Sequence, residues 1–270
     1  MKLDPVKQGE KIDLGDDAAA RPEKLPRKEK LIEETAQLTG RIDALQRALY
    51  AEGKRSVLVV FQARDAGGKD GVVRGVFGPL NQIGSHVTAF NAPTEDELAH
   101  DYLWRIHAAL PPRGTIGIFN RSHYEDVLVV RVHDLVPKHV WERRSDHLNA
   151  FERMLSDEGT TILKFFLHVS RDEQKERFLE RLDDPTKNWK FRAGDLDERD
   201  RWDDYTAAYE DAISRCSTEW APWYVVPADS KKARDYLVAR VVVDAMERMD
   251  PRFPDPEPGL DEYRDRLRNA

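Results

Sequence analysis

The feature that most constrains this 270-residue sequence is a continuously apolar run, Val57 to Phe61, that leads directly into a glycine-rich, charged loop. Strands that are apolar on both faces are typical of parallel sheets covered by helices. Similar short runs recur along the chain and alternate with longer amphipathic stretches. We expect strands at 56–62, 86–91, 115–120, 161–169 and 223–227, and helices at about 69–83, 95–109, 138–157, 171–182, 196–215 and 230–249. This pattern predicts an α/β fold with a doubly wound, parallel, five-stranded sheet flanked by helices.

The regions outside this alternation differ in character. Residues 1–27 contain three prolines and little periodicity, so they are expected to be an arm that wraps the domain or frays. A single domain is expected over 28–250, followed by a C-terminal tail at 251–270. A helix should open the domain, because apolar positions recur there at spacings of three and four: Leu31, Thr35, Leu38, Ile42, Leu45 and Leu49. This stripe fits packing against the domain or pairing in an oligomer.

Composition excludes several classes of protein. Hydrophobic residues make up 40% of the chain and charged residues 34%, which is typical of a soluble globular protein. The formal charge of −7 argues against a nucleic-acid binder, although a local cluster of cations can still attract a polyanion. No secretory signal or membrane-length apolar run is visible, and there is one cysteine, Cys216. We therefore expect a cytoplasmic protein without a membrane partner.

The loop after the first strand, Ala63 to Gly71, resembles the phosphate-binding P-loop, in which backbone amides, a helix N-terminus and a lysine hold phosphate oxygens. Gly67, Gly68 and Lys69 occupy the expected positions. However, Ala63 replaces the first glycine, and Asp70 replaces the hydroxyl residue that would bind Mg²⁺. Asp65 or Asp70 could supply a carboxylate to the metal instead. The competing interpretation is a simple glycine-rich turn.

A second charged cluster, Asn120 to Asp126, follows the third strand. Ligands bind beyond the carboxyl ends of parallel strands, so this cluster should lie near the loop. Arg121 is suited to neutralise a transferring phosphoryl group, unless it forms an ordinary surface pair with Glu125. Asn120 stands where an acidic metal ligand is common, so Glu125 or Asp126 could supply that charge. His123 is interpreted as structural rather than catalytic, and Arg131 as a further phosphate contact.

Positively and negatively charged residues alternate densely over 177–201, with Trp189 and Phe191 among them. Pro185 and Gly194 bracket this run. We expect a helical lid that closes over a ligand, and its basic residues could follow a chain of phosphates. A solvated surface loop is the alternative.

Several long motifs in order, Phe61 to Gly71, Phe119 to Val127 and Leu182 to Phe191, resemble the type-2 polyphosphate kinases, most closely their class III, which accepts both AMP and ADP. The likeness extends over about 54–249. It implies a P-loop kinase-like fold, transfer between polyphosphate and an adenine nucleotide, dependence on Mg²⁺ (or Mn²⁺), and a homo-oligomer such as a dimer or tetramer. Arg64 and Gly67 depart from the Met and Ala expected in this family.

The resemblance assigns roles to individual residues. Asp65, Lys69 and Arg121 are expected to be catalytic, and Asp65 to bind the metal. Other branches of the family have Asp where this chain has Asn120, so Asp126 is chosen as the second metal ligand. The expected phosphate and polyphosphate contacts are Arg64, Ala66, Gly67, Gly68, Lys69, Asp70, Gly71, Arg121, Tyr124, Arg131, Arg181, Lys187, Lys190 and Arg192. Two other readings stay open, an ATP-dependent nucleotide kinase of the same fold and a catalytically silent phosphate-binding scaffold.

Overall fold

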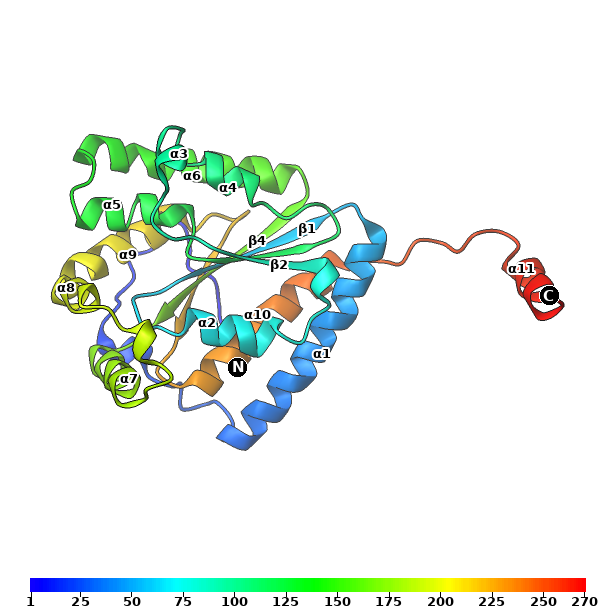
Figure 1. Cartoon of the computed structure of the whole chain (residues 1–270), viewed down its shortest axis with the longest axis horizontal. Helices are drawn as coiled ribbons and strands as arrows, with labels where there is room; N and C mark the ends of the chain where they lie inside the picture. The colour runs from blue at the N-terminus through cyan, green and yellow to red at the C-terminus, as the bar shows by residue number, and fades with distance from the viewer.

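A computed structural model describes all residues, 1–270, and contains one parallel sheet of five strands (Figure 1). The strands are β1 (Ser56–Gln62), β2 (Ser85–Ala89), β3 (Ile116–Asn120), β4 (Thr160–His168) and β5 (Trp223–Pro227). Their order is β2-β3-β1-β4-β5 and every neighbouring pair is parallel. The five predicted strands and the parallel fold class are confirmed. β1 lies in the centre and is buried along its whole length, as its apolar sequence requires.

Helices cover both faces of the sheet. α1 (Lys28–Glu52) and α10 (Lys231–Met249) pack side by side over one face, and α4 (Trp104–Ala108) and α6 (Lys138–Asp157) lie over the other (Figure 1). Alternate residues of β1 divide between the two cores: Val57 and Val59 join the α1 and α10 side, whereas Leu58 and Val60 join the opposite side. The period of two along a strand produces this division.

The apolar stripe of α1 packs within the domain. Leu31, Ile42 and Leu49 are almost fully buried in the core that α1 shares with α10. Of the two interpretations of this stripe, the structure therefore supports packing against the domain.

The N-terminal arm lies along the domain surface. Val6 N–H donates to Trp223 O at 2.9 Å, beside β5, and the Leu14 side chain is buried. Further along, Gly15 O is 2.9 Å from Nε2 of His168, and Asp16 Oδ1 accepts from Arg171 N–H at the start of α7 (Arg171–Asp183). The arm thus wraps the domain, passing the amino end of β5 at Val6 and the carboxyl end of β4 at Gly15. It then reaches the carboxyl end of β5, where Ala19 O accepts from Asp229 N–H at 3.3 Å.

Several predicted helices differ from the structure. The helix expected at 69–83 comprises α2 (Lys69–Val72) and a π-helical turn (Val73–Phe77), and that at 95–109 divides into α3 (Glu95–Leu98) and α4. The second break occurs where Asp101 Oδ1 accepts from Leu103 N–H, because such local side-chain bonds compete with the helix. The helix expected at 196–215 divides at Arg201 into α8 (Gly194–Asp200) and α9 (Trp202–Cys216).

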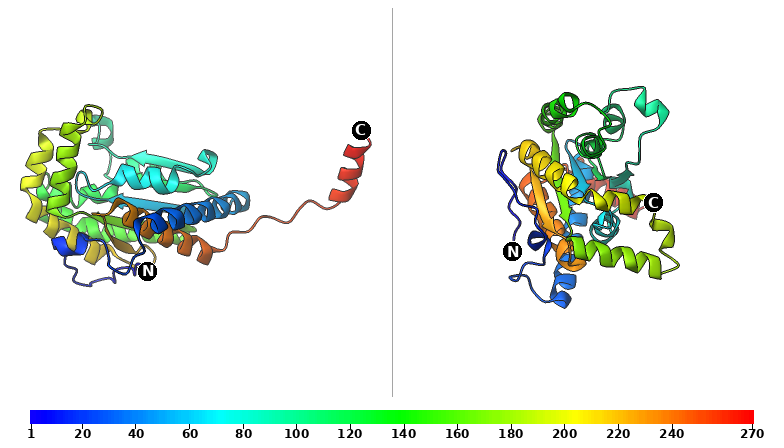
Figure 2. Two further views of the ribbon diagram at one scale, coloured as in Figure 1. Left: turned by 90° about the horizontal axis from the view of Figure 1, so that it is seen from below. Right: turned by 90° about the vertical axis from the view of Figure 1, so that its left-hand side faces the viewer.

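Two further helices were not predicted. α5 (Val129–Val132) follows the second charged cluster, and α11 (Leu260–Arg268) lies within the C-terminal tail, which projects away from the body (Figure 2). No helix has both the length and the apolar character needed to cross a membrane.

Candidate active site

The glycine-rich loop connects β1 to α2, and its path requires two glycines. Gly68 has a φ of +98°, and a Cβ added there would lie 2.0 Å from Nη1 of Arg234. A Cβ at Gly67 would lie 2.6 Å from the Cβ of Ala63. Only glycine fits both positions without a shift of the backbone or of the arginine. The loop is therefore tightly wound at the start of a helix, where backbone N–H groups are available to an anion.

Side chains from α7 and α10 hold the loop from behind. Arg177 Nη1 donates to Ala66 O at 2.9 Å, and Gln174 Nε2 donates to Asp65 O at the same distance. Arg234, which is paired with Asp235 at 2.6 Å, fills the space beside Gly68. These supporting residues were missed in the sequence, because charged residues in helices distant along the chain give no sign that they contact this loop.

Lys69 turns back over the loop. Its Nζ donates to Ala63 O at 2.8 Å. Burial, reinforced by the positive charge of Arg121, lowers the pKa of Lys69 to about 8. Arg121 is thus close enough to Lys69 for their positive charges to interact.

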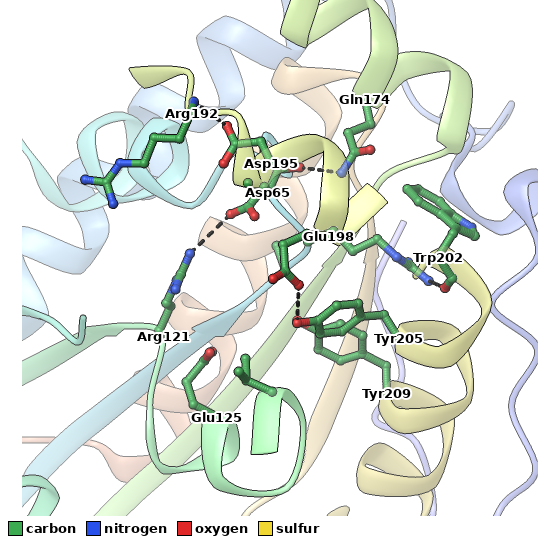
Figure 3. Close-up of a pocket in the computed structure, with 14 residues that line it drawn as sticks. Asp65, Arg121, Glu125, Gln174, Arg192, Asp195, Glu198, Trp202, Tyr205 and Tyr209 are labelled. Atoms are coloured by element: carbon green, nitrogen blue, oxygen red, sulfur yellow. Dashed lines mark hydrogen bonds and ion pairs between the residues drawn. The ribbon is translucent and has the colours of Figure 1, made fainter. Parts of the chain in front are cut away.

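Asp65 and Arg121 form the centre of the site. Arg121 Nη2 lies 3.2 Å from Asp65 Oδ1 (Figure 3). Arg121 follows β3 in a left-handed conformation, with φ of +64°, and its N–H donates to Phe61 O at 3.0 Å. The pairing of Arg121 is thus with Asp65, and the alternative of a surface pair with Glu125 is wrong.

Asp70 occupies the position of the usual hydroxyl residue and contacts the second cluster. Asn120 Nδ2 donates to Asp70 Oδ1 at 2.8 Å, and Lys190 Nζ lies 3.5 Å from Asp70 Oδ2. Lys190 reaches this point from the segment between α7 and α8. The contact brings the lid, the loop and the end of β3 together.

A pocket of about 270 Å³ opens beside Asp65 and Arg121 (Figure 3). One wall is aromatic and consists of Trp202, Tyr205 and Tyr209 from α9. The hydroxyl of Tyr205 donates to Glu198 Oε2 of α8 at 2.5 Å. The aromatic wall was not predicted, although aromatic residues at intervals of three and four residues share one helix face. The pocket also has acidic lining residues, namely Asp65, Glu125, Asp195 and Glu198.

Arg64 belongs to the wall of this pocket rather than to the phosphate cradle. Its guanidinium stacks over the Trp202 ring at 4.0 Å, and Nη2 donates to Thr206 Oγ1 at 2.5 Å. The side chain is buried. Nη2 thus bonds to α9, whereas Nε and Nη1 of Arg64 are buried without a partner, so the phosphate contact of Arg64 stays a prediction.

Three further residues predicted at the site lie away from the pocket in this structure. Tyr124 is completely buried, and its hydroxyl contacts Lys164 and Glu152 in the core, so it cannot touch phosphate. Arg131 pairs with Asp211 at 3.0 Å and does not line the pocket. The carboxylate of Asp126 lies 3.0 Å from Arg144, and neighbouring Glu125 lines the pocket instead. Residues His123–Asp126 form a 3-10 turn, in which neighbouring side chains point about 120° apart, and the sequence alone does not fix that turn.

The basic residues of the lid fall into two groups. Arg192 lines the pocket and Lys190 reaches Asp70, so both stand at the site. Arg181 pairs with Asp195 at 3.6 Å and Lys187 with Asp184 at 2.8 Å, so in this structure both serve contacts within the lid. Phe191 packs on Phe178 of α7, whereas Trp189 remains 74% exposed. His123 is buried against Glu152, in agreement with its structural interpretation.

Comparisons with known proteins agree with this geometry. The family described as Polyphosphate kinase 2 matches residues 26–254. The chain is 56% identical over 230 residues to the AMP/ADP-polyphosphate phosphotransferase of Meiothermus ruber, covering 85% of this chain and 86% of that protein. It is 45% identical to the ADP-polyphosphate phosphotransferase of Rhodopseudomonas palustris, over 94% of this chain and 92% of the relative.

A solved structure is similar over the whole length. The crystal structure of Polyphosphate Kinase 2 from Arthrobacter aurescens matches 100% of this chain and 99% of its own, with 38% identity and a TM-score of 0.93. A putative polyphosphate kinase 2 from Pseudomonas aeruginosa matches 88% of this chain and 49% of its own, with 35% identity and a TM-score of 0.80. With the family match, the high identity to two curated relatives and the shared fold, this chain belongs to the polyphosphate kinase 2 family.

Proposed function

We propose that this protein transfers phosphoryl groups from inorganic polyphosphate to AMP or ADP, reversibly, to give ADP or ATP. The observation that carries the proposal is the convergence of Lys69, Asp65 and Arg121 at the glycine-rich loop. Relatives that share about half of this sequence are named as phosphotransferases that act between polyphosphate and AMP or ADP. Such a site needs cations around phosphate and a separate pocket for the nucleotide, and the cations at the loop and the pocket beside it support the proposal.

The cations around the loop suit a polyanionic donor. Lys69 and Arg121 face the cradle, and Lys190 and Arg192 extend the positive charge along the lid. A chain of phosphates that followed these side chains would place its end phosphate beside Asp65 and Arg121. A cleft of local positive charge attracts a polyanion even when the protein as a whole is acidic.

The pocket beside the loop suits the nucleoside of the acceptor. Tyr205 and Tyr209 offer an aromatic wall, and the carboxylates of Glu125 and Asp195 can accept hydrogen bonds from sugar hydroxyls. Because the same pocket includes Asp65 and Arg121, a nucleotide seated there would direct its terminal phosphate at the end of the polyphosphate chain.

The residues would act mainly by position and charge. An oxygen of the acceptor phosphate attacks the terminal phosphorus of polyphosphate, and the bond from that phosphorus to its bridging oxygen breaks. Lys69 and Arg121 would neutralise the transferring group, and the bridging oxygen leaves with the shortened chain. An acceptor phosphate is already ionised near neutral pH, so no strong general base is needed. Phosphoryl transfer depends chiefly on this alignment and neutralisation.

A magnesium ion fits this site only if substrate supplies some of its ligands. No group of three or more acidic, histidine or cysteine side chains could hold a metal alone. Mg²⁺ commonly binds through one or two carboxylates together with substrate phosphates. Asp65 would hold the ion, with Glu125 rather than Asp126 as the second carboxylate, and Mn²⁺ could replace Mg²⁺. When bound, the metal would neutralise phosphate charge.

Two wider properties are also proposals. The family resemblance supports a homo-oligomer, a dimer or tetramer. The single cysteine, Cys216, which is buried and free, suits a reducing cytoplasm.

A direct assay tests the function. Purified protein is incubated with Mg²⁺, long-chain polyphosphate and either AMP or ADP, and the nucleotides are separated by chromatography. We expect ADP and ATP to form, and EDTA to stop the reaction. In parallel, AMP is supplied with ATP instead of polyphosphate. Product only in the second reaction would identify an ATP-dependent nucleotide kinase, and no product in either would indicate a phosphate-binding scaffold.

A further inference from the structure

A charged network lies completely buried beneath the second charged cluster. Lys164 in the middle of β4 and Glu152 of α6 have no exposed side-chain area, and their Nζ and Oε2 atoms are 2.6 Å apart. Lys164 interrupts an otherwise apolar strand between Leu163 and Phe165. Burying a charged pair of this kind costs desolvation free energy. An apolar residue in place of Lys164 would avoid that cost, so the pair gives the strand no obvious gain in stability.

The hydrogen bonds of this network are complete at its charged atoms. Lys164 Nζ donates to Glu152 Oε2, to the Tyr124 hydroxyl at 2.7 Å and to Cys216 O at 2.7 Å, so all three of its protons have acceptors. The Tyr124 hydroxyl donates to Glu152 Oε1 at 3.0 Å, and Nε2 of His123 lies at the same distance from that oxygen. Burial alone would raise the pKa of Glu152, but Lys164 and His123 lower it, so the carboxylate is held ionised.

The network joins directly to the turn that carries Arg121. His123 and Tyr124, both held by Glu152, are the second and third residues after Arg121. Between Arg121 and His123, Ser122 Oγ accepts from Gln62 Nε2 at 3.1 Å and from Tyr124 N–H at 3.2 Å. The turn is therefore fixed to β1 on one side and to α6 and β4 on the other.

Arg121 needs such support. Its φ of +64° is unfavourable for a residue with a side chain, and such conformations persist only where surrounding contacts determine them. Its guanidinium must also meet Asp65 at 3.2 Å across the site. The carbonyl of Phe61 holds the Arg121 N–H, but it does not fix the turn that follows.

We propose that Lys164, Glu152 and Tyr124 are positioning residues that hold Arg121 in its left-handed conformation for phosphoryl transfer. The inference rests on the proposed function and assigns these three residues a role in it without contact to substrate. A polar network whose charged atoms are all paired, as Lys164 Nζ and both Glu152 oxygens are here, specifies one arrangement more sharply than apolar packing, which tolerates small shifts. The network would thus cost some folding stability and fix the direction of the Arg121 guanidinium.

A double-mutant cycle with Arg121 tests this proposal. Tyr124→Phe removes only the hydroxyl link, and the triple variant Lys164→Met, Glu152→Leu, Tyr124→Phe replaces the network by apolar side chains. Each is made with Arg121 and with Arg121→Ala, and kcat, both KM values and the urea unfolding curve are measured. Val242→Ala on α10 is the control, because it opens a buried core site on the opposite face of the sheet.

We expect Tyr124→Phe and the triple variant to lower kcat about tenfold or more with little change in either KM, since small misplacements of catalytic groups are costly. In the Arg121→Ala background the same changes should have no further effect on kcat. Val242→Ala should lower the urea midpoint and leave kcat unchanged.

Additive losses of kcat in the two backgrounds would overturn the proposal, as would Tyr124→Phe with wild-type kcat. If Arg121→Ala has no measurable turnover, the test uses the kinetic constants of Tyr124→Phe and of the triple variant with Arg121 intact. A raised KM with unchanged kcat in these variants would contradict positioning. If the triple variant does not fold, Tyr124→Phe alone provides the cycle. Lack of turnover in the wild-type protein would instead refute the proposed function.

Discussion

Arg121 and Asp65, which are 56 residues apart in the sequence, meet at 3.2 Å beyond the carboxyl ends of two adjacent strands. β1 and β3 are parallel neighbours in register from Val57 with Ile116 to Phe61 with Asn120, so the residues after each strand emerge at the same edge. The pairing of the strands therefore brings together a carboxylate and a guanidinium that the sequence keeps apart.

The Asp65→Asn variant should lose turnover without losing its fold. The amide lacks the negative charge that attracts a cation and pairs with Arg121, so we expect kcat to fall by about 100-fold or more, a loss typical of removing a key electrostatic group. Both partners are partly exposed, with side-chain exposures of 28% and 40%, so the pair should contribute about 1 kcal/mol or less to stability. Steady-state turnover and urea unfolding measure the two effects. Near-normal turnover would remove Asp65 from the catalytic set.

The pH dependence should reflect Lys69. Because burial lowers its pKa to about 8, the free enzyme loses this positive charge as the pH rises through about 8. Since kcat/KM reports the free enzyme, kcat/KM for polyphosphate should decline above that pH, while kcat should decline at higher pH because bound phosphate stabilises the protonated amine. Initial rates between pH 6.5 and 9.5, in overlapping buffers at constant ionic strength, test this. A flat profile through this range would contradict the assignment.

Lys190 should contribute to binding the donor more than the acceptor. It reaches Asp70 from the lid at 3.5 Å, at the side of the loop where the phosphate chain would run. Lys190→Ala should raise the KM for polyphosphate about tenfold, the value of one charge-assisted contact, and change the KM for AMP much less. Lys231→Ala is the matched control, because Lys231 forms an exposed pair with Glu180. Equal changes in both KM values would contradict the location of the donor.

The geometry of the loop can be tested with two glycines. Gly68→Ala places a Cβ 2.0 Å from Arg234 Nη1 in a left-handed conformation, so the loop or Arg234, which packs beside it, must move, and we expect at least about a 100-fold loss of kcat/KM. Gly40→Ala is the control, because Gly40 lies within α1 with no atom within 4 Å of an added Cβ. It should stabilise the protein by roughly 1 kcal/mol through helix propensity and leave activity unchanged. Thermal unfolding measures the stability of both variants, and steady-state turnover measures their activity.

The sheet and the glycine-rich loop could be predicted from local patterns in the sequence. The strand at Ser56–Gln62 was predicted to the residue, because a continuous apolar run between charged segments can be buried in only a few ways. Gly67, Gly68 and Lys69 were identified because a phosphate cradle needs those residue types at fixed spacing. The family resemblance likewise rested on contiguous motifs.

Tertiary structure alone decided which side chains reach the site. Tyr124, Asp126 and Arg131 stood close to Arg121 in sequence, yet the turn after β3 directs Tyr124 into the core and Asp126 to Arg144. Trp202, Arg177 and Arg234 lie far along the chain, and helix packing brings each of them to the pocket or the loop. Spacing along a chain reports backbone periodicity, whereas the direction of a side chain in a turn and contacts between distant helices depend on packing.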